Sequence, residues 1–267
     1  MINIDQRRRE NRTEEQRKAQ TAAAIASRKN LPPARERSLQ NQLKVFDWIY
    51  KWGYSSSPII QQLLEKKSSN FTTVATRKNW LIKSATQSGM PNFYYTLSPP
   101  SLDTATTHSL ENYEYPEIEP WRVNQDLIKH QLLAQKITLN RLQSGRISDY
   151  LTERMINTAG DKLGVKRPDV VFLMKDLKIG VEIELSSKWG RKLDQFFMGI
   201  KSAFENGLYD GFFIYAESPK LIERYQIALN KPLTSWKKDD RGHWVAKEKI
   251  AFPAKFLKSV RFELVKG

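Results

Sequence analysis

The chain has 267 residues, 40% of them hydrophobic, which is enough for one large or two modest domains with a buried core. It contains no cysteine, which excludes a disulfide scaffold, a thiolate zinc site, an iron–sulfur cluster and a cysteine nucleophile. With only three histidines, any metal is expected to be a hard ion held by carboxylates. The formal net charge of +15 favours a polyanionic partner, nucleic acid ahead of membrane.

The start of the chain is polar and basic. Residues 1–37 are predicted to form a flexible tail, and a nucleic-acid or partner-binding arm stands beside the alternative of a solvated extension. No apolar run approaches the ~20 residues that a membrane span needs. The first residues also lack the apolar segment of a secretory signal. We therefore expect no membrane insertion and a cytoplasmic location.

Residues 38–100 predict a small helical domain with a β-hairpin. Apolar residues recur at helical spacing over residues 38–53, and a second, short helix follows the serines at 55–57. A third helix is predicted from about residue 70 to 83, and residues 93–97 have strand composition. This order is typical of a winged helix-turn-helix domain.

The third predicted helix carries polar side chains suited to phosphate and base-edge contacts. We therefore predict DNA binding through Arg77, Lys78, Asn79 and Lys83. The seven basic and two acidic residues between positions 41 and 100 favour this over the alternative of a helical packing or dimerisation module.

Residues 101–120 contain five acids and no lysine or arginine, together with proline, serine and threonine. This composition predicts an interdomain linker. Residues 121–267 then predict an α+β or α/β domain with a mixed central sheet. The expected elements are a helix over 124–142, a helix over 148–159, strands over 169–174 and 178–185, a helix over 188–206, a strand over 211–216 and a helix over 221–229.

The second of these strands places two carboxylates on one face. Val181, Ile183 and Leu185 alternate with Glu182 and Glu184. Neighbouring carboxylates repel each other unless a cation or good solvation compensates them. Asp169, at the head of the adjacent strand, would supply a third oxygen ligand if the two strands pair as a hairpin. We therefore predict a Mg²⁺ or Mn²⁺ site formed by Asp169, Glu182 and Glu184, with Lys188 offsetting charge on a phosphate.

The residues Arg167-Pro168-Asp169, Glu182-Ile183-Glu184 and Lys188 resemble the PD-(D/E)xK nuclease superfamily. The layout over about residues 40–215 resembles the MOBC-type relaxases of mobilizable plasmids, which join a winged helix to a restriction-endonuclease-like domain, and the related replication-relaxation proteins. The resemblance implies that Asp169 and Glu182 are metal-binding acids. It also implies that Lys188 replaces the usual lysine, where Glu184 stands, and that Glu153 is an auxiliary glutamate on the preceding helix.

The resemblance further implies a catalytic set of Asp169, Glu182, Glu184, Lys188 and Glu153 in an endonuclease that nicks DNA at an origin of transfer. The implied partners are double-stranded and nicked DNA, an accessory relaxosome protein and the coupling protein of a type IV secretion system. One alternative is a non-enzymatic DNA-binding regulator of replication or transcription that retains the fold. Another is a transposon or restriction-type endonuclease.

The remaining candidate side chains have simpler interpretations. His130 is expected to be a packed or capped histidine, and no spacing singles out Tyr150 or Tyr209 as a nucleophile. The nuclease hypothesis needs Asp169 to converge with both glutamates. A ribbon that turned Glu182 and Glu184 toward the interior would argue against phosphodiester cleavage.

Overall fold

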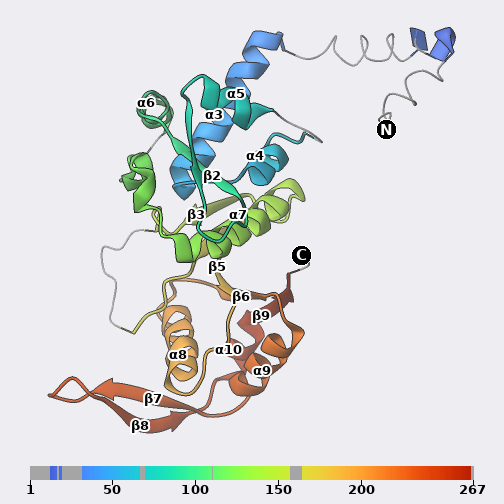
Figure 1. Ribbon diagram of the computed structural model, residues 1–267. Coiled ribbons are helices and arrows are strands. Elements are labelled where there is room, and N and C mark those ends of the chain that lie inside the picture. Colours follow the sequence, from blue (N-terminus) through green and yellow to red (C-terminus); the bar gives the residue numbers. More distant parts are fainter. Residues whose placement is uncertain are drawn as a thin grey trace. The chain divides into compact units, whose positions relative to one another are not determined.

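The computed structural model describes residues 13–16, 18–19, 32–66, 70–109, 111–156 and 164–265 (Figure 1). The chain divides into two compact units, Met1–Lys44 and Val45–Gly267. Most of the predicted tail at residues 1–37 lies outside the described residues. In the first unit, the described residues include an exposed ion pair between Lys18 and Glu14, at 3.0 Å, and the start of helix α3 (Ala34–Trp52).

The second unit begins with the remainder of α3, whose Val45, Phe46 and Ile49 are buried. It is followed by α4 (Ser57–Leu63), α5 (Phe71–Arg77) and an antiparallel hairpin of β1 (Leu81–Ala85) and β2 (Phe93–Leu97). The order of helices and strands agrees with the predicted one, but the end of the third helix does not.

Helix α5 ends at Arg77, whereas the sequence pattern extends it to residue 83. Asn79 has a φ of 55°, in the left-handed region that ends a helix, and the next residues turn into β1. In β1, Leu81 pairs with Leu97 and Lys83 with Tyr95. The ladder to β2 decides the conformation here, because a local helical pattern cannot show that a strand is available as a partner.

Residues 101–120, for which composition predicts an interdomain linker, contain regular structure. Helix α6 covers Pro99–His108, and its two leading prolines suit the first helical turn. Short 3₁₀ turns follow at η1 (Pro116–Ile118), η2 (Pro120–Arg122) and η3 (Gln125–Leu127). Tyr115 is buried and its hydroxyl donates a 2.6 Å hydrogen bond to the Gly53 carbonyl, which anchors the segment to the end of α3.

The rest of the unit has a mixed α/β fold around a mixed sheet, as predicted. Within the described residues the strand order is β3-β4-β5-β6-β9, with antiparallel pairing up to β5 and parallel pairing beyond it. The strands are β3 (Asp149–Thr152), β4 (Val170–Met174), β5 (Leu177–Glu184), β6 (Gly211–Ala216) and β9 (Val260–Leu264). The helices and the separate hairpin are α7 (Ile128–Gln143), α8 (Arg191–Glu205), α9 (Pro219–Leu229), α10 (Ala254–Ser259), β7 (Leu233–Lys238) and β8 (Trp244–Ile250).

Two sequence-based elements of this region are wrong. Asp149–Thr152 is a strand paired with β4, where a helix is predicted over residues 148–159, so Glu153 follows a strand. The segment is too short for its periodicity to distinguish a strand from a helical turn. Helix α8 begins at Arg191. Gly190, immediately before it, has a positive φ of 49°, which is not helical, so Lys188 lies in the loop that precedes α8.

The sheet separates apolar side chains into clusters on its two faces. Val181, Ile183 and Phe213 pack with residues of α3 and α7, whereas Phe212 and Ile214 pack with α8, α9 and α10. None of the helices in the described part of the chain combines the length and the apolar character that a membrane span requires.

Candidate functional site

Asp169 lies where β4 begins and its side chain extends the ladder between β4 and β5. Its backbone N–H donates to the Val181 carbonyl at 2.9 Å, and its Oδ2 accepts the Ile183 N–H at 2.8 Å. The side chain is 23% exposed, so the carboxylate is fixed by the sheet and still open to a cavity. The hairpin expected from the sequence therefore places Asp169 where the structure has it, at the end of the two strands.

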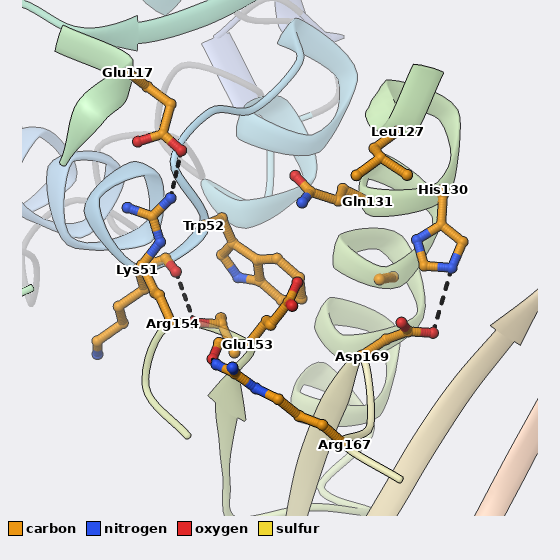
Figure 2. A pocket seen from close by; sticks show the side chains of 12 residues that line it. Lys51, Trp52, Glu117, Leu127, His130, Gln131, Glu153, Arg154, Arg167 and Asp169 are labelled. Carbon is orange, nitrogen blue, oxygen red and sulfur yellow. Dashed lines mark hydrogen bonds and ion pairs between the residues drawn. The ribbon is translucent and has the colours of Figure 1, made fainter. Parts of the chain in front are cut away.

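His130 is the residue of the site that sequence reasoning missed. It projects from α7, and its Nε2 lies 3.3 Å from Asp169 Oδ2 and 3.0 Å from the Ile183 carbonyl oxygen (Figure 2). Burial opposes ionisation of the imidazole, but the hydrogen bond and charge of Asp169 outweigh it, so the pKa of His130 is raised. A lone histidine in a helical pattern carries no signal of this contact.

Glu182 is buried beneath the helices that cover β5, with 2% of its side chain exposed. Its Oε2 lies 2.9 Å from Lys166 Nζ, and its Oε1 finds no hydrogen-bond partner among the described residues. Burial, followed by the charge of Asp169, raises the pKa of Glu182 well above its ordinary value, and Lys166 opposes this only in part. The site thus contains a carboxylate oxygen that lacks a compensating group.

Glu184 is also buried, with 3% of its side chain exposed. It forms an ion pair with Lys188 and accepts a 3.0 Å hydrogen bond from the Tyr225 hydroxyl of α9. Lys188 is therefore close to the predicted carboxylates, although it comes from a loop. Glu182 and Glu184 therefore both face the interior beneath α8 and α9, and each forms an ion pair with a lysine. This is the orientation that argues against phosphodiester cleavage.

Glu153 does not match the predicted auxiliary glutamate on a helix. It is exposed in the turn after β3, and its backbone carbonyl accepts a hydrogen bond from Arg167. Its side chain nevertheless lines the same cavity as Asp169. The residue that faces Asp169 from the preceding helix, α7, is His130.

A cavity of about 390 Å³ opens at Asp169 and His130 (Figure 2). Basic side chains contribute much of its wall: Lys51, Arg154 and Arg167. Trp52 adds an aromatic surface. Three acidic side chains, Glu117, Glu153 and Asp169, line it as well, so acidic side chains balance the lysine and arginines of the lining.

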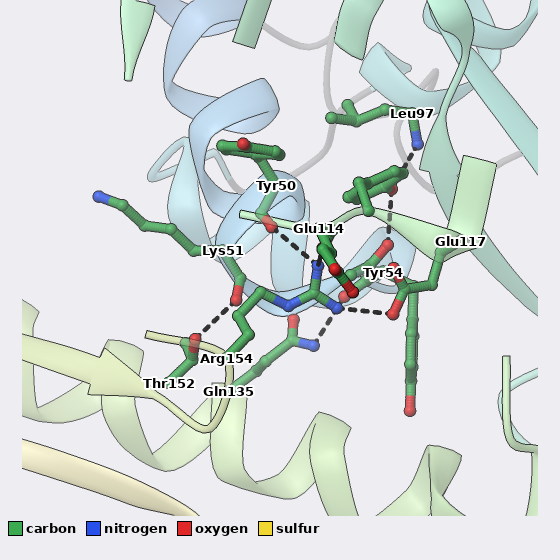
Figure 3. A network of polar contacts seen from close by, with 11 residues as sticks. Tyr50, Lys51, Tyr54, Leu97, Glu114, Glu117, Gln135, Thr152 and Arg154 are labelled. Atoms are coloured by element: carbon green, nitrogen blue, oxygen red, sulfur yellow. Dashed lines mark hydrogen bonds and ion pairs between the residues drawn. The ribbon is translucent and has the colours of Figure 1, made fainter. Parts of the chain in front are cut away.

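One wall of the cavity is held by a buried network around Arg154 (Figure 3). Its guanidinium donates to Glu117 at 2.6 Å and to the carbonyls of Tyr50 at 3.3 Å and Glu114 at 3.2 Å. Thr152 also donates to the Lys51 carbonyl at 2.7 Å. The network joins the end of α3, the segment before η1 and the turn after β3.

The predicted DNA contacts form an exposed group at α5 and β1. Arg77 ends α5, while Lys78 and Asn79 occupy the following turn. Lys83 lies on β1, with its Nζ 3.6 Å from the centre of the Phe93 ring, and Lys78 Nζ lies 4.6 Å from the centre of the Trp80 ring. All four predicted side chains are accessible, but they are distributed over the end of α5, the following turn and β1 instead of one helix.

Of the three predicted metal ligands, Asp169 lines the cavity, whereas Glu182 and Glu184 are buried and do not line it. The charge of Asp169 and that of Glu184 both act on the pKa of Glu182, so the three carboxylates are electrostatically coupled. However, no group of three or more His, Cys, Asp or Glu among the described residues is arranged to hold a metal ion. The unpartnered Glu182 Oε1 is the feature that fits a hard cation.

No protein-family model matches the chain, and no curated protein or solved structure shows a significant match to it.

Proposed function

We propose that this protein is a metal-dependent DNA endonuclease that nicks one strand. The proposal starts from the resemblance to the PD-(D/E)xK superfamily. A single observation carries it: Asp169 lies at the end of the β4 and β5 hairpin, where it lines a cavity together with His130 and Arg167, and its charge acts on the buried carboxylate of Glu182. The hairpin of β4 and β5, helix α8 and strand β6 follow one another in the order on which the resemblance rests, although strand β3 stands where the second expected helix would precede them.

Asp169 and Glu182 are the residues that would hold Mg²⁺ or Mn²⁺. When bound, such an ion acidifies water and stabilises charge on the scissile phosphate. Arg167, which lines the cavity with Asp169, would orient the phosphate. His130 lines the cavity with its Nε2 3.3 Å from Asp169, and its protonated form would deliver a proton to the leaving oxygen.

The resemblance to MOBC-type relaxases extends the proposal to an origin of transfer as the DNA site. In that case the exposed group of Arg77, Lys78, Asn79 and Lys83 would bind the duplex near the nick. A relaxosome accessory protein and a type IV coupling protein would be the protein partners. These partners rest on the resemblance alone.

A non-enzymatic DNA-binding regulator is the second candidate, and a specific observation favours it. Glu182 and Glu184 are buried and each is paired with a lysine, Lys166 and Lys188 respectively. Such ion pairs are also what remains in a fold that has lost its cation and keeps the carboxylates as internal supports.

A nicking assay on supercoiled plasmid carrying the cognate origin separates the candidates. We expect open-circular product with Mg²⁺ and none with EDTA. Asp169→Asn and Glu182→Gln should remove the product while the proteins stay folded and duplex binding persists. Asp176→Asn, an exposed change at the other end of the same hairpin, is the matched control and should nick normally.

Three outcomes would count against the proposal. An absence of metal-dependent product favours the regulator. Linear product favours a restriction-type endonuclease. Loss of DNA binding and folding together in both acid variants would mean that the two carboxylates support the structure only.

A further inference from the structure

The β7 and β8 hairpin is a basic ribbon that extends beside α8 (Figure 1). Its two strands together carry four lysines and one glutamate. Most of β8 is exposed, and Asp239 in the connecting turn is engaged by the backbone N–H groups of Arg241 and His243. The ribbon therefore presents net positive charge that the proposed nuclease site does not use.

Two tryptophans lie on one face of this ribbon. Lys238 pairs with Trp244 and Trp236 pairs with Ala246, so Trp236, Lys238 and Trp244 share a side. The Trp236 Nε1 donates to Asp194 of α8 at 2.9 Å, which fixes that indole. Trp244 is 38% exposed, and its ring centre lies 5.3 Å from the guanidinium carbon of Arg191 and 5.4 Å from Lys238 Nζ.

A cavity of about 790 Å³ is lined by residues of both the ribbon and α8. The two tryptophans, Lys237 and Lys238 line it, together with Gln195 and Met198 of α8. Among the described residues the lining contains no acidic side chain. Indole faces beside lysine ammonium groups are the combination that binds stacked bases and their phosphates.

We propose that this cavity binds single-stranded DNA, with a base stacked on Trp244 and backbone phosphates on Lys237 and Lys238. A duplex is a poor fit, because its bases already stack on each other and cannot reach an indole face. The inference rests on the proposed function in one respect: a nick allows a strand to separate, and the ribbon would hold that strand.

The test measures binding of a fluorescently labelled oligothymidine to the full chain by anisotropy, in EDTA, over a range of salt concentrations. Trp244→Ala should weaken binding about 5- to 150-fold, and Trp244→Phe should restore most of it. Lys237→Gln/Lys238→Gln should reduce the slope of log Kd against log salt by about 1.4.

Matched controls lie outside the cavity. Trp121→Ala removes a 76% exposed tryptophan of η2, and Lys220→Gln/Lys231→Gln removes two exposed charges; both should leave affinity and slope unchanged. An equal loss of duplex affinity in Trp244→Ala would overturn the proposal, as would an equal effect of the control lysines. Competition by polyglutamate as effective as that by oligothymidine would identify an acidic peptide site instead.

Because binding is measured in EDTA and nicking in Mg²⁺, the two proposals fail separately. Single-strand binding without nicking would refute the nuclease and keep the ribbon site. Nicking with oligothymidine affinity that is insensitive to Trp244 and both lysines would refute the ribbon site and keep the nuclease.

Discussion

The buried pair of Arg154 and Glu117 allows a stability prediction to be worked from contacts alone. The two side chains are 20% and 13% exposed and lie 2.6 Å apart. Removing the guanidinium in Arg154→Met leaves the Glu117 carboxylate in the interior without its counter-charge. It also leaves the carbonyls of Tyr50 and Glu114 without this donor. The interaction is therefore expected to act as a unit.

The cost of breaking one buried ion pair is about 3–5 kcal/mol, and we take ~3 kcal/mol because both groups retain some solvent contact. For a unit of this size, that corresponds to a decrease in Tm of about 6–12 °C. Glu117→Met should cost a similar amount. In the double variant no charge is left buried, so only the lost hydrogen bonds to carbonyls remain, at about 1 kcal/mol.

Urea unfolding of the four proteins of this cycle, followed by tryptophan fluorescence, measures the coupling. We expect the double variant to be destabilised by about 1 kcal/mol, well below the ~6 kcal/mol that the sum of the single changes gives. Two results would refute the view that this pair acts as a coupled network. One is a double variant whose decrease in unfolding free energy equals the sum of the two single decreases. The other is a decrease below about 1 kcal/mol in Arg154→Met.

Three further predictions concern the packing of the sheet, the candidate site and the DNA surface. Gly180→Ala should destabilise the protein by about 1–3 kcal/mol, because its Cβ would lie 2.4 Å from the Phe212 ring; an unchanged Tm would contradict this packing. In metal-free buffer, the stabilisation by His130 should be full below its ordinary pKa of 6.5 and be lost as pH rises through the raised folded pKa. The difference in unfolding free energy between the unaltered protein and His130→Gln should therefore shrink as pH rises. A difference that grows with pH would mean that folding lowers the pKa of His130. Arg77→Ala and Lys83→Ala should each reduce the salt slope of duplex binding by about 0.9, and an unchanged slope would remove that side chain from the interface.

Local patterns in the sequence were sufficient for the elements whose signal is contained in the segment itself. The alternation around Glu182 and Glu184, with the turn at Lys175 and Asp176, predicted the β4 and β5 hairpin and placed Asp169 at its end. These features depend on the two-residue period of a strand and on a short turn, both of which neighbouring residues specify.

Tertiary packing decided everything that depends on a partner distant in the chain. Burial of Glu182 followed from the helices that cover β5, and its Lys166 ion pair and the contact of His130 with Asp169 join separate segments. Asp149–Thr152 became a strand because β4 offered an edge to pair with. The acidic segment near Tyr115 packed because one aromatic side chain could be buried there. A periodicity reports only which residues of one segment share a face, whereas the free energy of burial and of ion pairing depends on what covers that face.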